Sequence, residues 1–138
     1  MAENAAAMKA NATADAINNR MKTAVVILNW NTKGFLEEFL PTLISSVEKV
    51  DGAEVVVADN CSTDGSMEMM AEKFPKVRTL VFEKNLGFTG GYNRAFRVID
   101  SEYFLLINSD IEVPEGWLQP LVDWMDNHPE CGACAPKL

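Results

Sequence analysis

The sequence predicts an α/β fold in which helices cover both faces of a mostly parallel sheet. Short runs rich in β-branched residues alternate along the chain with segments of helical periodicity. The runs are apolar throughout rather than at every second residue, as expected of strands that are buried on both faces. Such alternation implies right-handed crossovers between parallel strands. With 138 residues, the chain is long enough for one domain and too short for two independent cores.

Five runs along the chain are predicted to form strands. They are residues 23–28, 54–59, 77–82 and 103–107, with a weaker fifth run at residues 131–135. The fifth run contains Cys131 and Cys134, for which a redox or zinc pair is the alternative to buried thiols in a strand. The strand is favoured because the chain holds only three cysteines and residues three apart in a strand point to opposite faces.

Four helices are predicted among these strands: residues 34–50, 65–74 and 90–99, and a fourth that begins at Pro114. Pro41 is expected to break the first helix into two pieces, because proline removes a backbone donor and clashes with the preceding turn. Ser62, Thr63 and Asp64 precede the second helix and are residue types that cap helix N-termini. The fourth helix carries large apolar residues at helical spacing, namely Trp117, Leu121, Trp124 and Met125.

The first twenty residues differ in composition from the rest of the chain. They contain eight Ala and four Asn, with Met1, Met8 and Ile17 as the only larger apolar side chains. An isolated helix shorter than about 15 residues is marginal in water. Residues 1–20 are therefore expected to form a frayed or disordered extension, and residues 21–138 the folded domain. Met21 is the hypothetical natural start.

Composition excludes several classes of protein. Twelve Lys and Arg against twenty Asp and Glu give a net charge of -8, which disfavours nucleic acid as a partner. No run approaches the roughly 18 apolar residues of a membrane span, and residues 1–20 lack the apolar run of a signal peptide. Three cysteines suit a reducing compartment. A cytoplasmic location is predicted, with peripheral membrane association left open for a full-length protein.

Polar residues follow each of the first four predicted strands, at the carboxyl ends where open parallel sheets bind their ligands. The first of these loops, residues 29–33, lacks the glycine fingerprints of dinucleotide sites and phosphate loops, so both classes lose support. The groups that these loops do offer to a ligand are carboxylates and amides. They suit a nucleotide whose phosphates are held through Mg2+ or Mn2+, because such ions prefer oxygen ligands.

Four segments in order carry a resemblance to a known family. They are residues 24–31 (AVVILNWN), 57–66 (VADNCSTDGS), 85–93 (NLGFTGGYN) and 106–110 (LINSD). Together they resemble the motifs of glycosyltransferase family 2, and the third is similar to that of its bacterial rhamnosyltransferase-like members. The resemblance implies the GT-A fold, a Rossmann-like three-layer arrangement. It also implies inverting transfer from a dTDP-sugar or UDP-sugar to a glycan or lipid-linked acceptor hydroxyl, in cell-surface polysaccharide synthesis.

The resemblance also implies roles for residues at the donor site. Trp30 matches an aromatic that stacks on the nucleotide base, the alternative being packing against the first helix. Asp59 matches a carboxylate that accepts from the base, with turn formation as its alternative. Gly87, Gly90 and Gly91 permit positive φ and close backbone approach, ahead of a helix whose N–H groups face an anion. The other nucleotide-sugar-binding candidates are Asn29, Asn31, Asn60, Ser62, Asp64, Asn93 and Asn108.

Residues 108–110 stand where the family carries an Asp-x-Asp metal motif. The resemblance implies that Asp110 holds Mg2+ or Mn2+ against the diphosphate, whose charge a cation neutralises as the nucleotide departs. Asn108 departs from the two-acid pattern, which leaves the number of carboxylate ligands open. The alternative is a surface turn, since Asn, Ser and Asp all favour turns.

The resemblance reaches the last residues, whereas the family continues into an acceptor-binding half that carries the general base. No residue of this chain matches that base, which is expected beyond Leu138. The chain is therefore interpreted as a truncated, donor-binding half of a metal-dependent glycosyltransferase. The alternative is a nucleotide-sugar-binding module without catalysis. A signalling or flavin domain is disfavoured, because residues 29–33 offer neither an acid cluster nor a phosphate loop.

Overall fold

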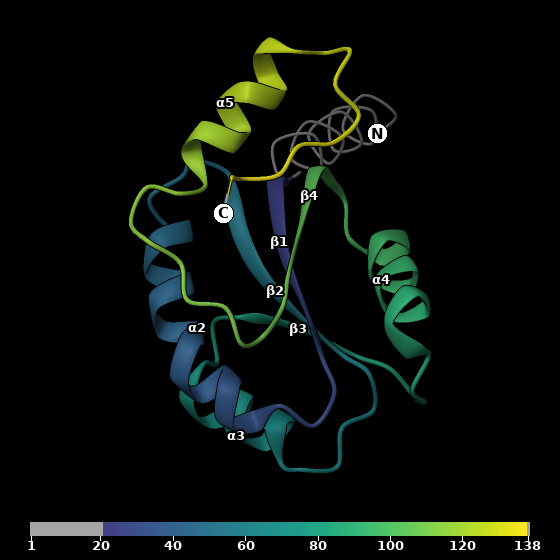
Figure 1. Ribbon diagram of the computed structural model, residues 1–138. Coiled ribbons are helices and arrows are strands. Elements are labelled where there is room, and N and C mark those ends of the chain that lie inside the picture. The colour runs from purple at the N-terminus through teal and green to yellow at the C-terminus, as the bar shows by residue number, and fades with distance from the viewer. Residues whose placement is uncertain (1–20, 138) are drawn as a thin grey trace, which may run out of the picture.

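The computed structural model describes residues 21–137. The extension predicted for residues 1–20 lies outside the described residues. In chain order the elements are β1 (Met21–Asn29), α2 (Lys33–Val47), β2 (Ala53–Asp59), α3 (Ser66–Lys73), β3 (Arg78–Val81), α4 (Gly87–Val98), β4 (Ser101–Ile107) and α5 (Gln119–Asn127). The alternation of strand and helix predicted from the sequence is confirmed (Figure 1).

The four strands form one parallel sheet in the order β3-β2-β1-β4. The register pairs Asn29 with Asp59 and Ile27 with Ile107. The carboxyl ends of β1, β2 and β4 therefore meet at one edge of the sheet, which faces the lower part of Figure 1. The residues that follow these three strands are brought together there.

Helices cover both faces of the sheet, which gives the predicted three layers. α2, α3 and α5 lie on one side and α4 on the other (Figure 1). Val25 and Ile27 of β1 join the core under α2, whereas Ala24 and Val26 join the core under α4. Alternate side chains point to opposite faces of a strand, so an apolar run without alternation is needed to supply both cores.

The two edge strands are less buried than the sequence pattern predicts. β3 and β4 each pair on one side within the described sheet. Val81 of β3 is 63% exposed, and Leu106 of β4 is 50% exposed. The expectation of burial on both faces therefore holds for the central strands β1 and β2 only.

The fifth predicted strand, residues 131–135, is wrong. These residues form no strand. Cys131 is half-buried and Cys134 is exposed, so the prediction of buried strand thiols is wrong as well. The Cys131 N–H donates to the His128 carbonyl at 2.8 Å, which closes a turn instead of a ladder. The side chains of this run are too small to gain much from burial in a sheet.

Helix α2 runs unbroken through Pro41, so the predicted break is wrong. Leu36, Leu40 and Leu43 are buried on both sides of the proline and hold both halves against the sheet. Pro41 itself is exposed. On an exposed face of a helix, water can satisfy the backbone carbonyl that loses its partner to a proline.

Helix α5 begins at Gln119 rather than at Pro114. Gly116 has a φ of +72°, outside the right-handed helical region, so the helix cannot form across it. Leu118 and Val122, four residues apart, are the residues of this segment that are buried. Their spacing places them on one face of the helix.

The two tryptophans predicted for the fourth helix differ, because Trp117 packs against the core and Trp124 is exposed. Trp117 precedes the helix, and its Nε1 donates to Ser46 Oγ of α2 at 3.0 Å. Trp124 is 51% exposed and stacks on His128 with 3.7 Å between ring centroids. The helical spacing of these residues in the sequence therefore does not identify the buried face of α5.

Candidate functional site

The Asn29 side chain ties together the loops that follow β1 and β2. It is fully buried. Its Nδ2 donates to Asp59 Oδ1 at 2.7 Å and to Ser62 Oγ at 3.0 Å. Its Oδ1 accepts from Thr32 Oγ1 at 2.5 Å. Both donors and the acceptor of this amide are thus used inside the protein.

The Asp59 carboxylate is buried at the same point and accepts hydrogen bonds through both oxygens. It is 1% exposed. Oδ1 accepts from Asn29, and Oδ2 accepts from the Ser62 backbone N–H at 2.9 Å. A buried carboxylate needs such partners, because its desolvation is otherwise costly. Asp59 therefore fixes the start of the loop after β2.

Asn31 joins the same two loops through a left-handed turn. Its φ is +56°, a region that Asn tolerates better than most residues. Its backbone N–H donates to Ser62 Oγ at 2.9 Å, and its Oδ1 accepts from the Thr63 N–H at 2.8 Å. Asn31 and Ser62, both predicted as ligand contacts, thus have protein partners.

Asp64 links the first turns of α2 and α3. Its Oδ2 accepts from the Lys33 N–H at 2.9 Å, and its Oδ1 accepts from the Ser66 N–H at 3.0 Å and from the Ser66 hydroxyl. Burial alone would raise the pKa of Asp64, but these bonds outweigh it and the pKa lies below its ordinary value. The helix-entry role predicted for this segment is met by Asp64, while Gly65 occupies the N-cap position.

Asn60 connects the loop after β2 to the loop after β3. It is 2% exposed. Its Nδ2 donates to Asn85 Oδ1 at 2.9 Å and to the Gly87 carbonyl at 3.1 Å. Its Oδ1 accepts from the Leu86 N–H at 2.8 Å. One buried amide therefore holds the glycine-containing loop in place.

The three glycines of residues 85–93 differ in backbone conformation and in surroundings. Helix α4 starts at Gly87, so Gly90 and Gly91 lie inside it, and of the three only Gly87 has a positive φ, +72°. A Cβ on Gly91 would lie 2.5 Å from Leu28 Cδ1. Gly91 therefore lets α4 pack closely on β1, so the predicted close approach is present there, whereas the positive φ expected at Gly90 and Gly91 is wrong.

Four predicted residues are exposed, three of them after strands at the carboxyl edge and the fourth, Asn93, in the middle of α4. Trp30 is 55% exposed, and Asn93, Asn108 and Asp110 are exposed as well. Within residues 21–137 their side chains form no hydrogen bond or ion pair. The exposure of Trp30 argues against the alternative that it packs under the first helix. These side chains are available to a ligand.

Asp110 and Asn108 carry the oxygen donors that Mg2+ and Mn2+ prefer. Among the described residues, no group of three or more His, Cys, Asp or Glu side chains is placed to hold a metal ion. One carboxylate and one amide fit an ion that takes its remaining ligands from phosphate and water. They do not fit a cage made by protein side chains alone.

Three further side chains belong to this site and were missed in the sequence. Thr32 holds Asn29, and Asn85 accepts from both Asn60 and the Gly87 N–H, the latter at 2.7 Å. The Tyr92 hydroxyl donates to the Ile107 carbonyl at 3.3 Å. Asn85 and Tyr92 lie inside the third motif, which could have drawn attention to them. Nothing in the sequence singles out Thr32.

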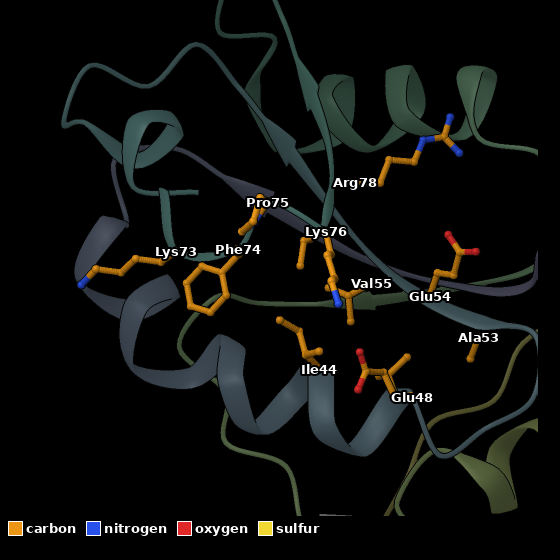
Figure 2. A pocket seen from close by; sticks show the side chains of 12 residues that line it. Ile44, Glu48, Ala53, Glu54, Val55, Lys73, Phe74, Pro75, Lys76 and Arg78 are labelled. Carbon is orange, nitrogen blue, oxygen red and sulfur yellow. The ribbon is translucent and has the colours of Figure 1, made fainter. Parts of the chain in front are cut away.

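A cavity of about 520 Å³ lies away from this edge, between α2, the start of β2 and residues 73–78 (Figure 2). Ile44, Val55 and Phe74 line it. The first residue of β2 that pairs with β3 is Val56. Residues 53–55 of β2 therefore have no β3 neighbour on that side, and the cavity lies beside them. It shares no residue with the predicted site.

The sequence motifs at the carboxyl edge fall within a family match. The chain matches the family model described as "Glycosyl transferase family 2" over residues 24–136. Sugar transfer is thus the class of chemistry to which the fold and the site are related. The chain belongs to glycosyl transferase family 2.

Two curated relatives illustrate the range of the family. The chain is 28% identical over 125 residues to N-acetylglucosaminyl-diphospho-decaprenol L-rhamnosyltransferase of Mycobacterium tuberculosis, covering 83% of this chain and 40% of that protein. It is 28% identical over 111 residues to the poly(ribitol-phosphate) beta-N-acetylglucosaminyltransferase TarS of Staphylococcus aureus, covering 78% of this chain and 19% of TarS. The chain therefore spans well under half the length of either relative.

Solved structures place the fold among GT-A glycosyltransferases. Residues 1–349 of S. aureus TarS in complex with UDP superpose with a TM-score of 0.65 at 24% identity, over 85% of this chain and 38% of that one. The mannosyltransferase PcManGT of Pyrobaculum calidifontis, in complex with GDP-Man and Mn2+, gives a TM-score of 0.65 at 26% identity, over 77% and 32%. The predicted fold is confirmed. In residues 21–137 no helix has the length and apolarity to cross a membrane.

Proposed function

We propose that this chain is the donor-binding half of an inverting glycosyltransferase and binds a dTDP-sugar or UDP-sugar at the carboxyl edge of its sheet. The observation that carries the proposal is the placement of exposed Trp30, Asn108 and Asp110 beside a buried hydrogen-bonded scaffold. Relatives bound to UDP and to GDP-Man with Mn2+ support a nucleotide-sugar donor.

In this proposal the exposed residues contact the donor. Trp30 stacks on the base, a contact of about 1 to 3 kcal/mol that tolerates different bases. Asn108 and Asp110 hold Mg2+ or Mn2+, and Asn93 faces the sugar diphosphate. When bound, the cation neutralises charge on the nucleoside diphosphate. The Gly87 N–H is bonded to Asn85, so in this proposal the N–H groups that follow it in the first turn of α4 face the anion.

The buried residues act on the donor indirectly. Asn29, Asp59 and Asn60 spend their hydrogen bonds on one another and on the neighbouring loops. We propose that Asp59 positions Asn31 and Ser62 and that its carboxylate does not reach the base. Preorganised loops of this kind cost little ordering when the ligand binds.

A glycan or lipid-linked acceptor and a cytoplasmic location complete the proposal. The three thiols are free, as a reducing compartment allows. The second candidate is a nucleotide-sugar-binding module without transfer. It is favoured by the use of Asp59 and Asp64 in hydrogen bonds to protein, which leaves neither as a general base at this edge.

Titration calorimetry with UDP and with dTDP tests the proposal. One of the two should bind more tightly with Mn2+ present than without it. Asp110→Ala should abolish that difference. The control Glu130→Ala removes one charge from an exposed loop after α5 and should leave the difference intact. Equal affinity with and without Mn2+ would count against the cation site, and absence of nucleotide binding would count against donor binding.

A further inference from the structure

The end of β4 is held by a hydroxyl that comes from α4. Tyr92 is 3% exposed, and its hydroxyl donates to the Ile107 backbone carbonyl at 3.3 Å. Ile107 is the last residue of β4. Asn108 and Asp110 follow it directly in the chain, so the bond lies at the base of the segment that presents both side chains.

The position of Tyr92 is fixed from several directions. Its ring packs edge-on against Phe88, with 5.0 Å between centroids, and lies tilted against the ring of Phe96, with 6.0 Å between centroids. Gly91, the preceding residue, allows α4 to approach Leu28. Burial raises the pKa of Tyr92 above its ordinary value, against the opposing effect of a backbone hydrogen bond with Leu28. A buried hydroxyl of this kind needs a partner, and the Ile107 carbonyl provides it.

The bond joins two motifs that are separate in sequence. Tyr92 lies in the segment of residues 85–93, and Ile107 lies in residues 106–110. Within residues 21–137, the side chains of Asn108 and Asp110 are exposed and form no hydrogen bond. The backbone placement of this segment therefore depends on β4 pairing with β1 and on the Tyr92 hydroxyl.

We infer that Tyr92 is a positioning residue for cation-assisted donor binding: its hydroxyl sets the backbone from which Asn108 and Asp110 reach the metal. The inference rests on the proposed function, because it assigns a supporting residue to the same site. Tyr92 itself contacts neither nucleotide nor cation. It acts through the Ile107 carbonyl.

Tyr92→Phe tests this inference, since it keeps the ring and its packing and removes only the hydroxyl. Tyr103→Phe is the matched control. The Tyr103 hydroxyl bonds Asp126 Oδ1 at 2.9 Å, near the opposite end of β4. Each variant removes one tyrosine hydroxyl and one hydrogen bond, at the carboxyl end of β4 for Tyr92 and near its amino end for Tyr103. Circular dichroism of both should match that of the unmutated chain.

Calorimetry with UDP, with and without Mn2+, is the first readout. Tyr92→Phe should weaken Mn2+-dependent binding roughly three- to tenfold, the factor expected for one hydrogen bond, and leave metal-free binding unchanged. Tyr103→Phe should change neither. Full Mn2+-dependent binding by Tyr92→Phe would overturn the inference. Equal losses in the two variants would overturn it as well, because they would indicate general weakening of β4.

The carbonyl carbon shift of Ile107 and the amide shifts of residues 108–110, recorded by NMR without ligand, are the second readout. Tyr92→Phe should move them, and Tyr103→Phe should not. This readout separates the two proposals: if the unmutated chain binds no nucleotide, the proposed function fails while the shifts still decide whether Tyr92 sets this segment. Unchanged shifts in Tyr92→Phe would overturn the inference.

Discussion

The carboxyl edge of the sheet has two unlike halves. At the ends of β1 and β2, Asn29, Asp59 and Asn60 are buried and their polar atoms bond to the protein. At the end of β4, Asn108 and Asp110 are exposed and form no such bonds within residues 21–137. Both halves were predicted to bind the donor. We propose from this difference that the first half supports the loops and the second half meets the ligand.

The aspartates of the two halves give the largest expected contrast. Asp59→Ala removes one of the two acceptors of the buried Asn29 amide and the acceptor of the Ser62 N–H, and should lower the free energy of unfolding by about 2 to 4 kcal/mol. Asp110→Ala should change it by no more than about 0.5 kcal/mol, because the side chain is exposed and unbonded. Urea denaturation of both variants measures the difference. Similar small losses in the two would remove the distinction between the halves.

The contact between α4 and β1 gives a smaller effect. Gly91→Ala places a methyl group 2.5 Å from Leu28 Cδ1 and should cost about 1 to 3 kcal/mol of unfolding free energy. Gly34→Ala in α2 is the control, since a Cβ there meets nothing within 4 Å. It should be neutral or stabilise by up to about 1 kcal/mol.

A second variant sharpens that result. In a Leu28→Ala background the space beside Gly91 is larger, so Gly91→Ala should cost less than in the unmutated chain. An unchanged cost would mean that the Leu28 contact is not its cause. The two substitutions are neighbours, and non-additivity is the expected signature of their contact.

The smallest effect concerns the charge of Asp64. Its pKa is lower in the folded chain than the ordinary value of 3.8, so its stabilising contribution is present above that value and is lost as the pH falls through the folded pKa. Asp64→Asn should therefore show a weaker decline of the urea midpoint below pH 3.8 than the unmutated chain. Identical declines would show that the bonds to Lys33 and Ser66 do not depend on the charge.

The sequence predicts most helices and strands, but it predicts less well which of their residues are buried. Continuous apolar runs predict β1 and β2 because each supplies two cores. The prediction of a strand at residues 131–135 is wrong because a short run of small side chains resembles a strand but cannot bury much surface. The predicted break at Pro41 is wrong because the proline lies on an exposed face of α2. Helix propensity alone does not predict which face of a helix is exposed.

At the site, residue types could be predicted and their partners could not. Asn, Asp and Ser after a strand indicate polar loops, yet the same types serve to hold a loop and to hold a ligand. Only the register that pairs Asn29 with Asp59 shows that these two meet each other. Likewise, Gly91 indicates close backbone approach, but only the structure shows that the side chain it approaches is Leu28.

The location of bound nucleotide tests the central claim most directly. A crystal structure of this chain with UDP or dTDP and Mn2+ should place the base against Trp30 and the metal on Asp110, with Asp59 still bonded to Asn29 and Ser62. A nucleotide bound in the cavity beside Phe74, or a metal held by other residues while Asp110 stays in solvent, would contradict the account.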